Sequence, residues 1–287
     1  MNIGVDIGGT NIRAGIELNG QITNQRHLLL KDKESLASTL DQLKGLLRPL
    51  LQQPVGGIGI GVPSVVDVNK GIVYNVMNIP SWDEVALRDI LESEFNIPVT
   101  INNDVNCFTL GEHRFGLAQK YKSVIGISIG TGIGSGIIID NKLYSGANCG
   151  AGEIGMIPYQ DSILEDYVCN RYFENSIGIN AFQAHSRAIS ADPIALQAWK
   201  DFGKHLANAI KIVMYTYDPE AIVIGGSLAK ASAFFKEAML EAIKDFAYPK
   251  SVNRIKFFLS ENENIALLGA AALLDDISQP TLKSSIL

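Results

Sequence analysis

The sequence predicts a mixed α/β protein built from two similar halves. Its 287 residues suggest one large domain or two ordinary ones, at roughly 150 residues per domain. Apolar residues make up 47% and charged residues 19%, the balance of a globular chain with a sizeable core. The same order of elements occurs twice, as three hairpin-linked strands followed by helices that alternate with strands. Two α/β halves imply a cleft between them, where small ligands usually bind.

The first half begins with strands joined by tight turns. Asn19-Gly20 is a strong hairpin signal, because both central residues of a type I′ turn need a positive φ. Leucines at helical spacing indicate the first helix, and they are Leu36, Leu40, Leu43 and Leu47. Ser81 or Asp83 is the expected cap of the second helix. Strands are predicted over 3–8, 12–18, 21–30, 58–62, 71–74 and 99–101. Helices are predicted over 33–51, 83–95 and 104–113.

The second half repeats this order without a clear repeat of residues, so the duplication is one of architecture. Strands are predicted over 122–129, 135–139, 143–145, 221–225 and 254–259. Helices are predicted over 162–174, 192–217, 228–246 and 264–275. We expect the last helix to pack back on the first half. The expected domains are therefore a small α/β domain, 1–102 plus 264–287, and a larger one, 103–263.

Charge and cysteine usage exclude several classes of protein. Lys plus Arg is 24 and Asp plus Glu is 30, a net charge of −6, which argues against a nucleic-acid binder. The three scattered cysteines form no C-x-x-C pair and indicate a reduced, intracellular protein. The N-terminus has no signal-peptide pattern, and uncharged runs such as 123–139 contain too many glycine turns to span a membrane. We expect a cytoplasmic location and no membrane partner.

Glycine-rich turns follow equivalent strands of the two halves. Glycines let backbone N–H groups approach an anion closely, although a plain tight hairpin explains either turn about as well. The turn at 130–136 is not a P-loop, because no Gly-Lys-Ser/Thr follows. Together they could hold a polyphosphate, and Asp6 could hold Mg²⁺ directly or through water. The first turn consists of Asp6, Gly8, Gly9, Thr10 and Asn11. The second consists of Gly130, Thr131 and Gly132, and a strand-to-helix turn adds Gly225, Gly226 and Ser227.

Polar residues that could bind or activate a sugar occur at three places. Asn102-Asn103-Asp104 stands at a strand end and helix start, where it could cap the helix or supply a general base. Glu153 stands between glycines, and Glu165 follows twelve residues later. Carboxylates and amides that converge on a ligand suit a sugar, whose hydroxyls need paired donors and acceptors. A solvated helix face is the alternative for Glu165.

These residues together resemble the ROK family of sugar kinases, over nearly the whole chain. Single motifs would be weak, and their order and spacing carry the resemblance. The motifs are Asp6–Thr10, Gly61-Val62-Pro63, Asn78-Ile79-Pro80-Ser81-Trp82, Asn103-Asp104, Gly130–Gly136, Gly146–Gly155, Asp218–Gly226 and Leu268-Gly269-Ala270-Ala271.

The resemblance implies an actin-like, hexokinase-like (ribonuclease H-like) fold with ATP and Mg²⁺ at the glycine turns. It implies a hexose held by Asn78, Asn103, Asp104, Glu153 and Glu165, with Asp104 as the base that activates a sugar hydroxyl, usually O6. Ser64, where the family often has glycine, joins the expected sugar-binding residues. The resemblance also suggests a homodimer. A valine at position 132 should impair ATP binding and spare sugar binding.

The segment before Glu165 departs from the family. Met156 stands where the family usually has histidine, and 157–164 lacks the cysteines of its zinc loop. A closed zinc site needs four ligands, so we expect no structural zinc. The loop would then hold Glu165 by packing alone, through Met156, Ile157 and Tyr159. The site should also discriminate less strictly among substituents at the C1–C2 end of the sugar.

Several functions remain open from the sequence. The leading one is an ATP-dependent hexokinase acting on glucose. The same fold could phosphorylate mannose, an N-acylated hexosamine, fructose or a glucoside. A repressor of this family would carry a helix-turn-helix domain in front, for which a first hairpin at residue 6 leaves no room. A catalytically dead sugar-binding regulator fits poorly with the presence of Asp104, Asp6 and both glycine hairpins.

Overall fold

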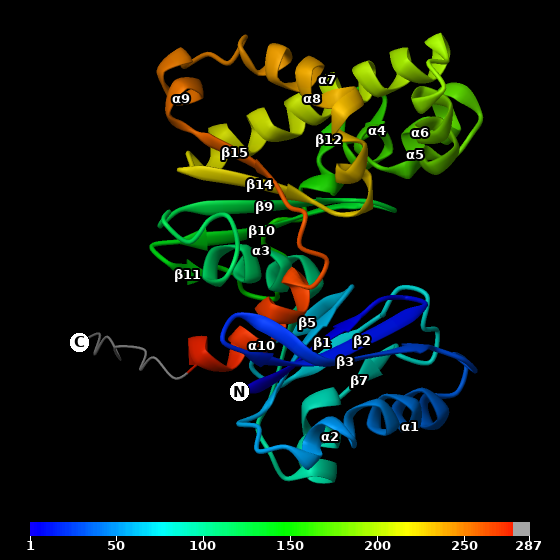
Figure 1. Ribbon diagram of the computed structural model, residues 1–287, viewed down its shortest axis with the longest axis vertical. Coiled ribbons are helices and arrows are strands. Elements are labelled where there is room, and N and C mark those ends of the chain that lie inside the picture. The colour runs from blue at the N-terminus through cyan, green and yellow to red at the C-terminus, as the bar shows by residue number, and fades with distance from the viewer. Residues whose placement is uncertain (278–287) are drawn as a thin grey trace. The chain divides into compact units, whose positions relative to one another are not determined.

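The computed structural model describes residues 1–277 and divides the chain into two compact units (Figure 1). The first unit comprises Met1–Gly116, Lys142–Gly150 and the described residues from Glu263 onward. The second comprises Leu117–Asn141 and Ala151–Asn262. None of the described helices is both long enough and apolar enough to cross a membrane.

The first unit is built on a sheet with strand order β3-β2-β1-β4-β8. Strands β1 to β3 are antiparallel neighbours, while β4 runs parallel to both β1 and β8. The Asn19-Gly20 turn joins β2 to β3, and both of its residues have positive φ, as expected for this hairpin. The strands are β1 Asn2–Ile7, β2 Asn11–Leu18, β3 Gln21–Leu29, β4 Ile58–Val62, β5 Val65–Asp67, β6 Ile72–Tyr74, β7 Glu84–Val85, β8 Val99–Asn103 and β11 Lys142–Leu143.

Helices pack on this sheet from both faces (Figure 1). Helix α10 lies against β1 and β4 so closely that a Cβ on Gly59 would sit 1.7 Å from the carbonyl oxygen of Ala270. A Cβ on Gly269 would likewise sit 1.7 Å from the carbonyl oxygen of Cys107, so α10 and α3 also touch through backbone. The helices are α1 Leu36–Leu47, α2 Leu87–Phe95, α3 Asp104–Arg114 and α10 Ile265–Ile277, with a 3-10 turn η1 Leu50–Gln52.

The last helix thus packs on the first half, as expected. Its contact with α3 also groups 103–116 with the first unit, whereas the sequence expectation began the second domain at residue 103. Residues 278–287 of the expected small domain lie outside the described residues.

The second unit carries strands in the order β10-β9-β14-β15, with a layer of helices packed against them (Figure 1). Its core is aromatic: Trp199 and Phe202 of the long helix α7 contact Phe173 and Phe235, and all four are fully buried. The strands are β9 Val124–Ile129, β10 Ile133–Ile139, β12 Pro158–Tyr159, β13 Ser162–Ile163, β14 Ala221–Gly225 and β15 Lys256–Leu259. The helices are α4 Glu165–Val168, α5 Asn170–Ile177, α6 Ala181–Ile189, α7 Pro193–Tyr217, α8 Ser232–Ile243 and α9 Pro249–Arg254, with 3-10 turns η2 Ile154–Met156 and η3 Ser227–Ala231.

Several predicted boundaries were wrong for tertiary reasons. Helix α2 begins at Leu87, because Glu84–Val85 pairs with β6 as strand β7. Neither expected cap is used, since the helix has no side-chain cap. The helix expected over 162–174 is broken at Cys169, whose backbone is extended and whose thiol caps α5. Helices α6 and α9 were not anticipated.

Candidate active site

The first glycine turn and Asn78 lie together in the first unit. The turn is closed by the Gly8 N–H, which donates to the Asn11 carbonyl at 2.8 Å, and Thr10 at its tip is exposed. A Cβ on Gly9 would meet the Asn78 side-chain nitrogen at 2.7 Å, so only glycine leaves room for this amide. The Lys33 ammonium donates to the Gly9 carbonyl. A predicted phosphate-binding turn therefore contacts a predicted sugar-binding residue, although 69 positions separate Gly9 from Asn78.

Asp6 on β1 faces Arg13, its cross-strand neighbour on β2. The guanidinium donates to the Asp6 Oδ2 from Nε at 3.2 Å and from Nη2 at 2.6 Å. Among residues 1–277 no group of three or more His, Cys, Asp or Glu side chains could hold a metal. Magnesium needs few carboxylates, because it keeps several waters and also binds substrate phosphates. Asp6 fits such a role through Oδ1 or a bridging water, with Arg13 holding Oδ2.

Asn103, the last residue of β8, is the N-cap of α3. Its Oδ1 accepts the Val105 N–H at 2.9 Å and the Asn106 N–H at 3.3 Å. Its side-chain nitrogen donates to the Ser64 carbonyl at 3.4 Å. Asp104 is then the first residue of the helix, half-buried, with Oδ1 accepting the Val105 N–H at 2.9 Å. The amide of Asn103 therefore caps the helix, the Asp104 carboxylate shares the Val105 N–H with it, and the role of Asp104 as a base stays a prediction.

Together with burial, the charges of Asp104 and Asp6 both raise the pKa of one buried thiol, that of Cys107. Burial, and then the charges of Asp104, Asp6 and Cys149, raise the pKa of Cys107 well above its usual value. Cys107 also contacts β4, where a Cβ on Gly61 would lie 3.1 Å from its sulfur and 3.3 Å from the Asp104 Cα. The expected magnesium carboxylate and the expected base thus lie at the same end of the first sheet.

A buried polar cluster beside Asn103 was not anticipated from the sequence. The Asn102 Oδ1 accepts the Asn106 amide at 2.9 Å and the Cys149 thiol at 3.1 Å, and the Asn102 amide nitrogen donates to the Ser145 Oγ at 3.2 Å. The cluster ties the 142–150 segment to the start of α3, although Cys149 must adopt a positive φ of 59°. The signal in the sequence was Asn102 itself, an amide at the end of an apolar strand.

The Ser64 hydroxyl is used inside its own loop. It donates to the carbonyl of Tyr74 at 2.6 Å and lies 3.0 Å from that of Val65. Because a hydroxyl has one proton, any contact of Ser64 with a sugar would use its oxygen as an acceptor or its backbone. Its role in sugar binding stays a prediction.

The structure brings the other two predicted phosphate-binding segments together in the second unit. The Gly130 N–H donates to the Gly132 carbonyl at 2.9 Å, which closes the β9–β10 turn. A Cβ on Gly130 would lie 3.2 Å from the Ser227 Oγ, so this turn touches the start of η3. Gly226 has a φ of 88°, and its Cβ would lie 2.3 Å from the Ile129 carbonyl oxygen, so no other residue fits there.

Gly132 contacts a predicted sugar ligand. A Cβ at this position would lie 2.5 Å from the Glu165 Oε2, and the same oxygen accepts the Ile133 N–H at 3.2 Å. The Glu165 carboxylate therefore occupies the space that a side chain at 132 would need. The expectation that a valine at 132 spares sugar binding does not follow from this geometry, because the valine would displace Glu165.

Glu153 is carried on a loop that is pinned to β10. The carbonyl of Gly152 accepts both the backbone N–H and the hydroxyl of Ser135, at 3.0 and 2.8 Å. Glu153 is exposed, yet the surrounding protein limits its hydration, and this together with the charge of Glu165 raises its pKa above the usual value. The two acidic side chains thus lie close enough to repel each other, as expected of residues that converge on one ligand.

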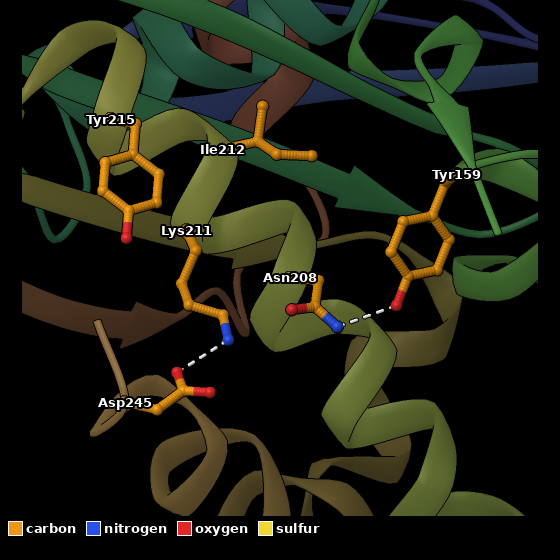
Figure 2. Close-up of a pocket in the computed structure, with 6 residues that line it drawn as sticks. All are labelled: Tyr159, Asn208, Lys211, Ile212, Tyr215 and Asp245. Atoms are coloured by element: carbon orange, nitrogen blue, oxygen red, sulfur yellow. Dashed lines mark hydrogen bonds and ion pairs between the residues drawn. The ribbon is translucent and has the colours of Figure 1, made fainter. Parts of the chain in front are cut away.

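The segment before Glu165 is held differently from the sequence expectation. Met156 is 62% exposed, so it does not hold the loop by packing. Ile157 and Tyr159 do pack against the core of the second unit. The Tyr159 hydroxyl also accepts from the Asn208 amide at 2.7 Å and is hydrogen-bonded to the His205 Nδ1 at 3.0 Å. Figure 2 shows Tyr159 and Asn208 meeting at one end of a pocket along α7.

Burial favours a neutral His205 beside Tyr159. The Tyr159 hydroxyl accepts from Asn208 and has a proton that it can donate to an unprotonated His205 Nδ1. Burial lowers the pKa of His205, which favours the neutral ring that accepts this proton. The β12–β13 turn that leads to Glu165 is therefore anchored on α7 by polar bonds as well as by packing.

The chain is similar to known proteins over almost its whole length. The model of the ROK family matches residues 2–277. A xylose repressor of Bacillus spizizenii is 27% identical over 95% of this chain and 76% of its own length. A glucokinase of Halalkalibacterium halodurans is 27% identical over 92% of this chain and 91% of its own.

Among solved structures, a ROK family glucokinase from Streptomyces griseus, in complex with glucose and AMPPNP, aligns with a TM-score of 0.80. It is 25% identical and covers 95% of this chain and 98% of its own. The hexokinase-like α/β fold expected from the sequence is thereby confirmed. Since the family model spans nearly all described residues, we conclude that this chain belongs to the ROK family.

Proposed function

We propose that this protein is an ATP-dependent hexokinase that transfers the γ-phosphoryl group of ATP to a hexose hydroxyl, O6 of glucose. The observation that carries the proposal is the placement of Asp104 at the start of α3, next to the cap residue Asn103. Asn103 caps the helix, and Asp104 beside it is a half-buried carboxylate whose Cα lies near Gly61, the neighbour of Asp6 across β1 and β4. A carboxylate there is suited to accept the proton of a sugar hydroxyl during phosphoryl transfer.

The remaining predicted site residues would bind the sugar, the phosphates of ATP and magnesium. Asn78 and Asn103 offer amides to sugar hydroxyls, and Glu153 and Glu165 offer carboxylate oxygens. The turns at Gly8–Asn11 and Gly130–Gly132, with Gly225–Ser227, present backbone N–H groups to the phosphates. Magnesium, when bound near Asp6, supplies positive charge to the transferring group.

Turnover with a panel of sugars tests the proposal. Purified protein would be assayed for ADP release with glucose, mannose, an N-acylated hexosamine, fructose and a β-glucoside, and each product would be mapped for the phosphorylated oxygen. The expected result is sugar-dependent ADP release, highest with glucose. ADP release without any dependence on sugar would refute the proposal.

A second candidate function is a sugar-binding regulator that does not turn over. The observation in its favour is the similarity to xylose repressors. Sugar binding by calorimetry without ADP release under any condition would support it and would contradict the kinase. The homodimer, the magnesium requirement and the cytoplasmic location remain proposals that sedimentation, metal titration and cell fractionation would test.

A further inference from the structure

Arg171, on the first turn of α5, lies beside the predicted sugar ligand Glu165. Its Nη2 is 3.4 Å from the Glu165 Oε1, and its Nη1 donates to the Asp166 Oδ1. Asp166 is held in turn by the Ser162 hydroxyl. Hydrogen bonds from Ser162 and from Arg171 lower the pKa of Asp166, so it remains the charged partner of Arg171.

Glu165 is thus contacted on both oxygens by donors from different elements. The Ile133 N–H of β10 reaches Oε2 at 3.2 Å, and Arg171 of α5 lies on the side of Oε1. One anchor would leave a carboxylate able to swing about its own bond, whereas two anchors define the directions of its remaining lone pairs. An ionised carboxylate accepts about four hydrogen bonds, so acceptor sites remain for sugar hydroxyls.

The arrangement suits arginine specifically. A planar guanidinium can donate to two carboxylates at once, while a lysine ammonium is a point charge that cannot keep this fork. Arg171 also offsets repulsion between Glu165 and Glu153, whose pKa is already raised in part by the charge of Glu165.

We propose that Arg171 is a positioning residue for sugar binding, which holds the Glu165 carboxylate in the orientation that accepts the sugar. The inference rests on the proposed function, because it takes Glu165 as a sugar ligand. Arg171 acts on the sugar only through Glu165, so its loss should weaken sugar binding and leave the phosphoryl-transfer step intact.

The test compares Arg171→Ala with a matched control, Arg187→Ala. Arg171 is 47% exposed in its side chain and Arg187 is 45% exposed, and Arg187 pairs with Asp192 on another part of the second unit. Exposed ion pairs contribute little to stability, so both variants should fold and melt within a few degrees of the wild type. Sugar affinity would be measured by calorimetry without nucleotide, and kcat and both KM values by ADP release.

A partly exposed hydrogen bond to a charged group is worth about a factor of ten in affinity, so we expect about a tenfold rise in the sugar Kd and KM of Arg171→Ala. The ATP KM and kcat should change less than about threefold, and Arg187→Ala should match the wild type. Arg171→Lys should recover part of the sugar affinity, because it restores the charge without the fork.

Four outcomes separate the inference about Arg171 from the proposed function. Sugar affinity of Arg171→Ala equal to that of Arg187→Ala, in a wild type that binds and phosphorylates the sugar, overturns the inference and leaves the proposed function standing. Loss of kcat with unchanged sugar Kd also overturns it, because Arg171 would then act on the reaction itself. If the wild type neither binds nor phosphorylates any sugar, the proposed function fails. If Arg171→Ala does not fold, the comparison of Arg171→Lys with the wild type decides.

Discussion

Replacing Gly132 with alanine should weaken sugar binding and leave ATP binding nearly unchanged, although Gly132 lies in a turn of the type that binds phosphates. The new Cβ would lie 2.5 Å from the Glu165 Oε2, while ordinary contacts begin at 3.4 Å. The oxygen must therefore retreat by about 0.9 Å. Its 3.2 Å bond to the Ile133 N–H cannot survive a shift of that size.

The magnitude follows from the lost bond. A hydrogen bond to a charged group contributes about 1.5–3 kcal/mol, and the partial exposure of Glu165, 24% in its side chain, places this one toward the low end. At about 1.4 kcal/mol per factor of ten, we expect the sugar Kd to rise about tenfold. The ATP KM should rise less than about twofold, because the turn keeps its closing bond from Gly130 to Gly132.

Gly130→Ala is the matched control in the same turn. Its Cβ would lie 3.2 Å from the Ser227 Oγ, a contact that rotation of the serine hydroxyl relieves. The methyl group would then stand between two predicted phosphate-binding segments, so this variant should raise the ATP KM and spare the sugar Kd. Calorimetry with sugar alone and ADP-release kinetics separate the two effects, and thermal melting checks folding. A Gly132→Ala variant with normal sugar affinity and impaired ATP binding would refute the reasoning.

The other predictions concern the base, the acid pair and the metals. Asp104→Asn should lower kcat by roughly 10²–10⁴-fold and leave the fold and sugar Kd nearly intact, because Asn103 supplies the cap; near-normal kcat would remove Asp104 from the mechanism. Because the pKa of Glu153 is raised, its carboxylate becomes protonated at a higher pH than that of an ordinary glutamate, and a protonated carboxyl is a poorer acceptor. Sugar affinity should therefore fall as the pH drops through that range. Glu153→Gln should remove this inflection from the calorimetric profile of sugar affinity against pH. Metal analysis of untagged protein should find no stoichiometric zinc, and activity lost to a chelator should return with magnesium; activity that only zinc restores would contradict both expectations.

Local chemistry let the sequence alone determine most elements of both sheets. The Asn19-Gly20 turn predicted the β2–β3 hairpin, because the positive φ that this turn needs is a property of those two residues themselves. The order and spacing of the glycine and acidic motifs predicted the family, which the comparisons confirmed. Element ends were predicted less well, since contacts such as the pairing of β7 with β6 shortened α2 against its local signals.

Only the tertiary structure decided which predicted site residues touch. Asn78 lies against Gly9, and Glu165 fills the space beside Gly132 across 33 positions of sequence. The sequence did not predict the contact of Arg171 with Glu165. The two residues are six positions apart across the break at Cys169, outside the spacing at which helical neighbours meet. These contacts depend on how strand turns and short helices converge at a sheet end, and that convergence depends on packing between residues far apart in the chain.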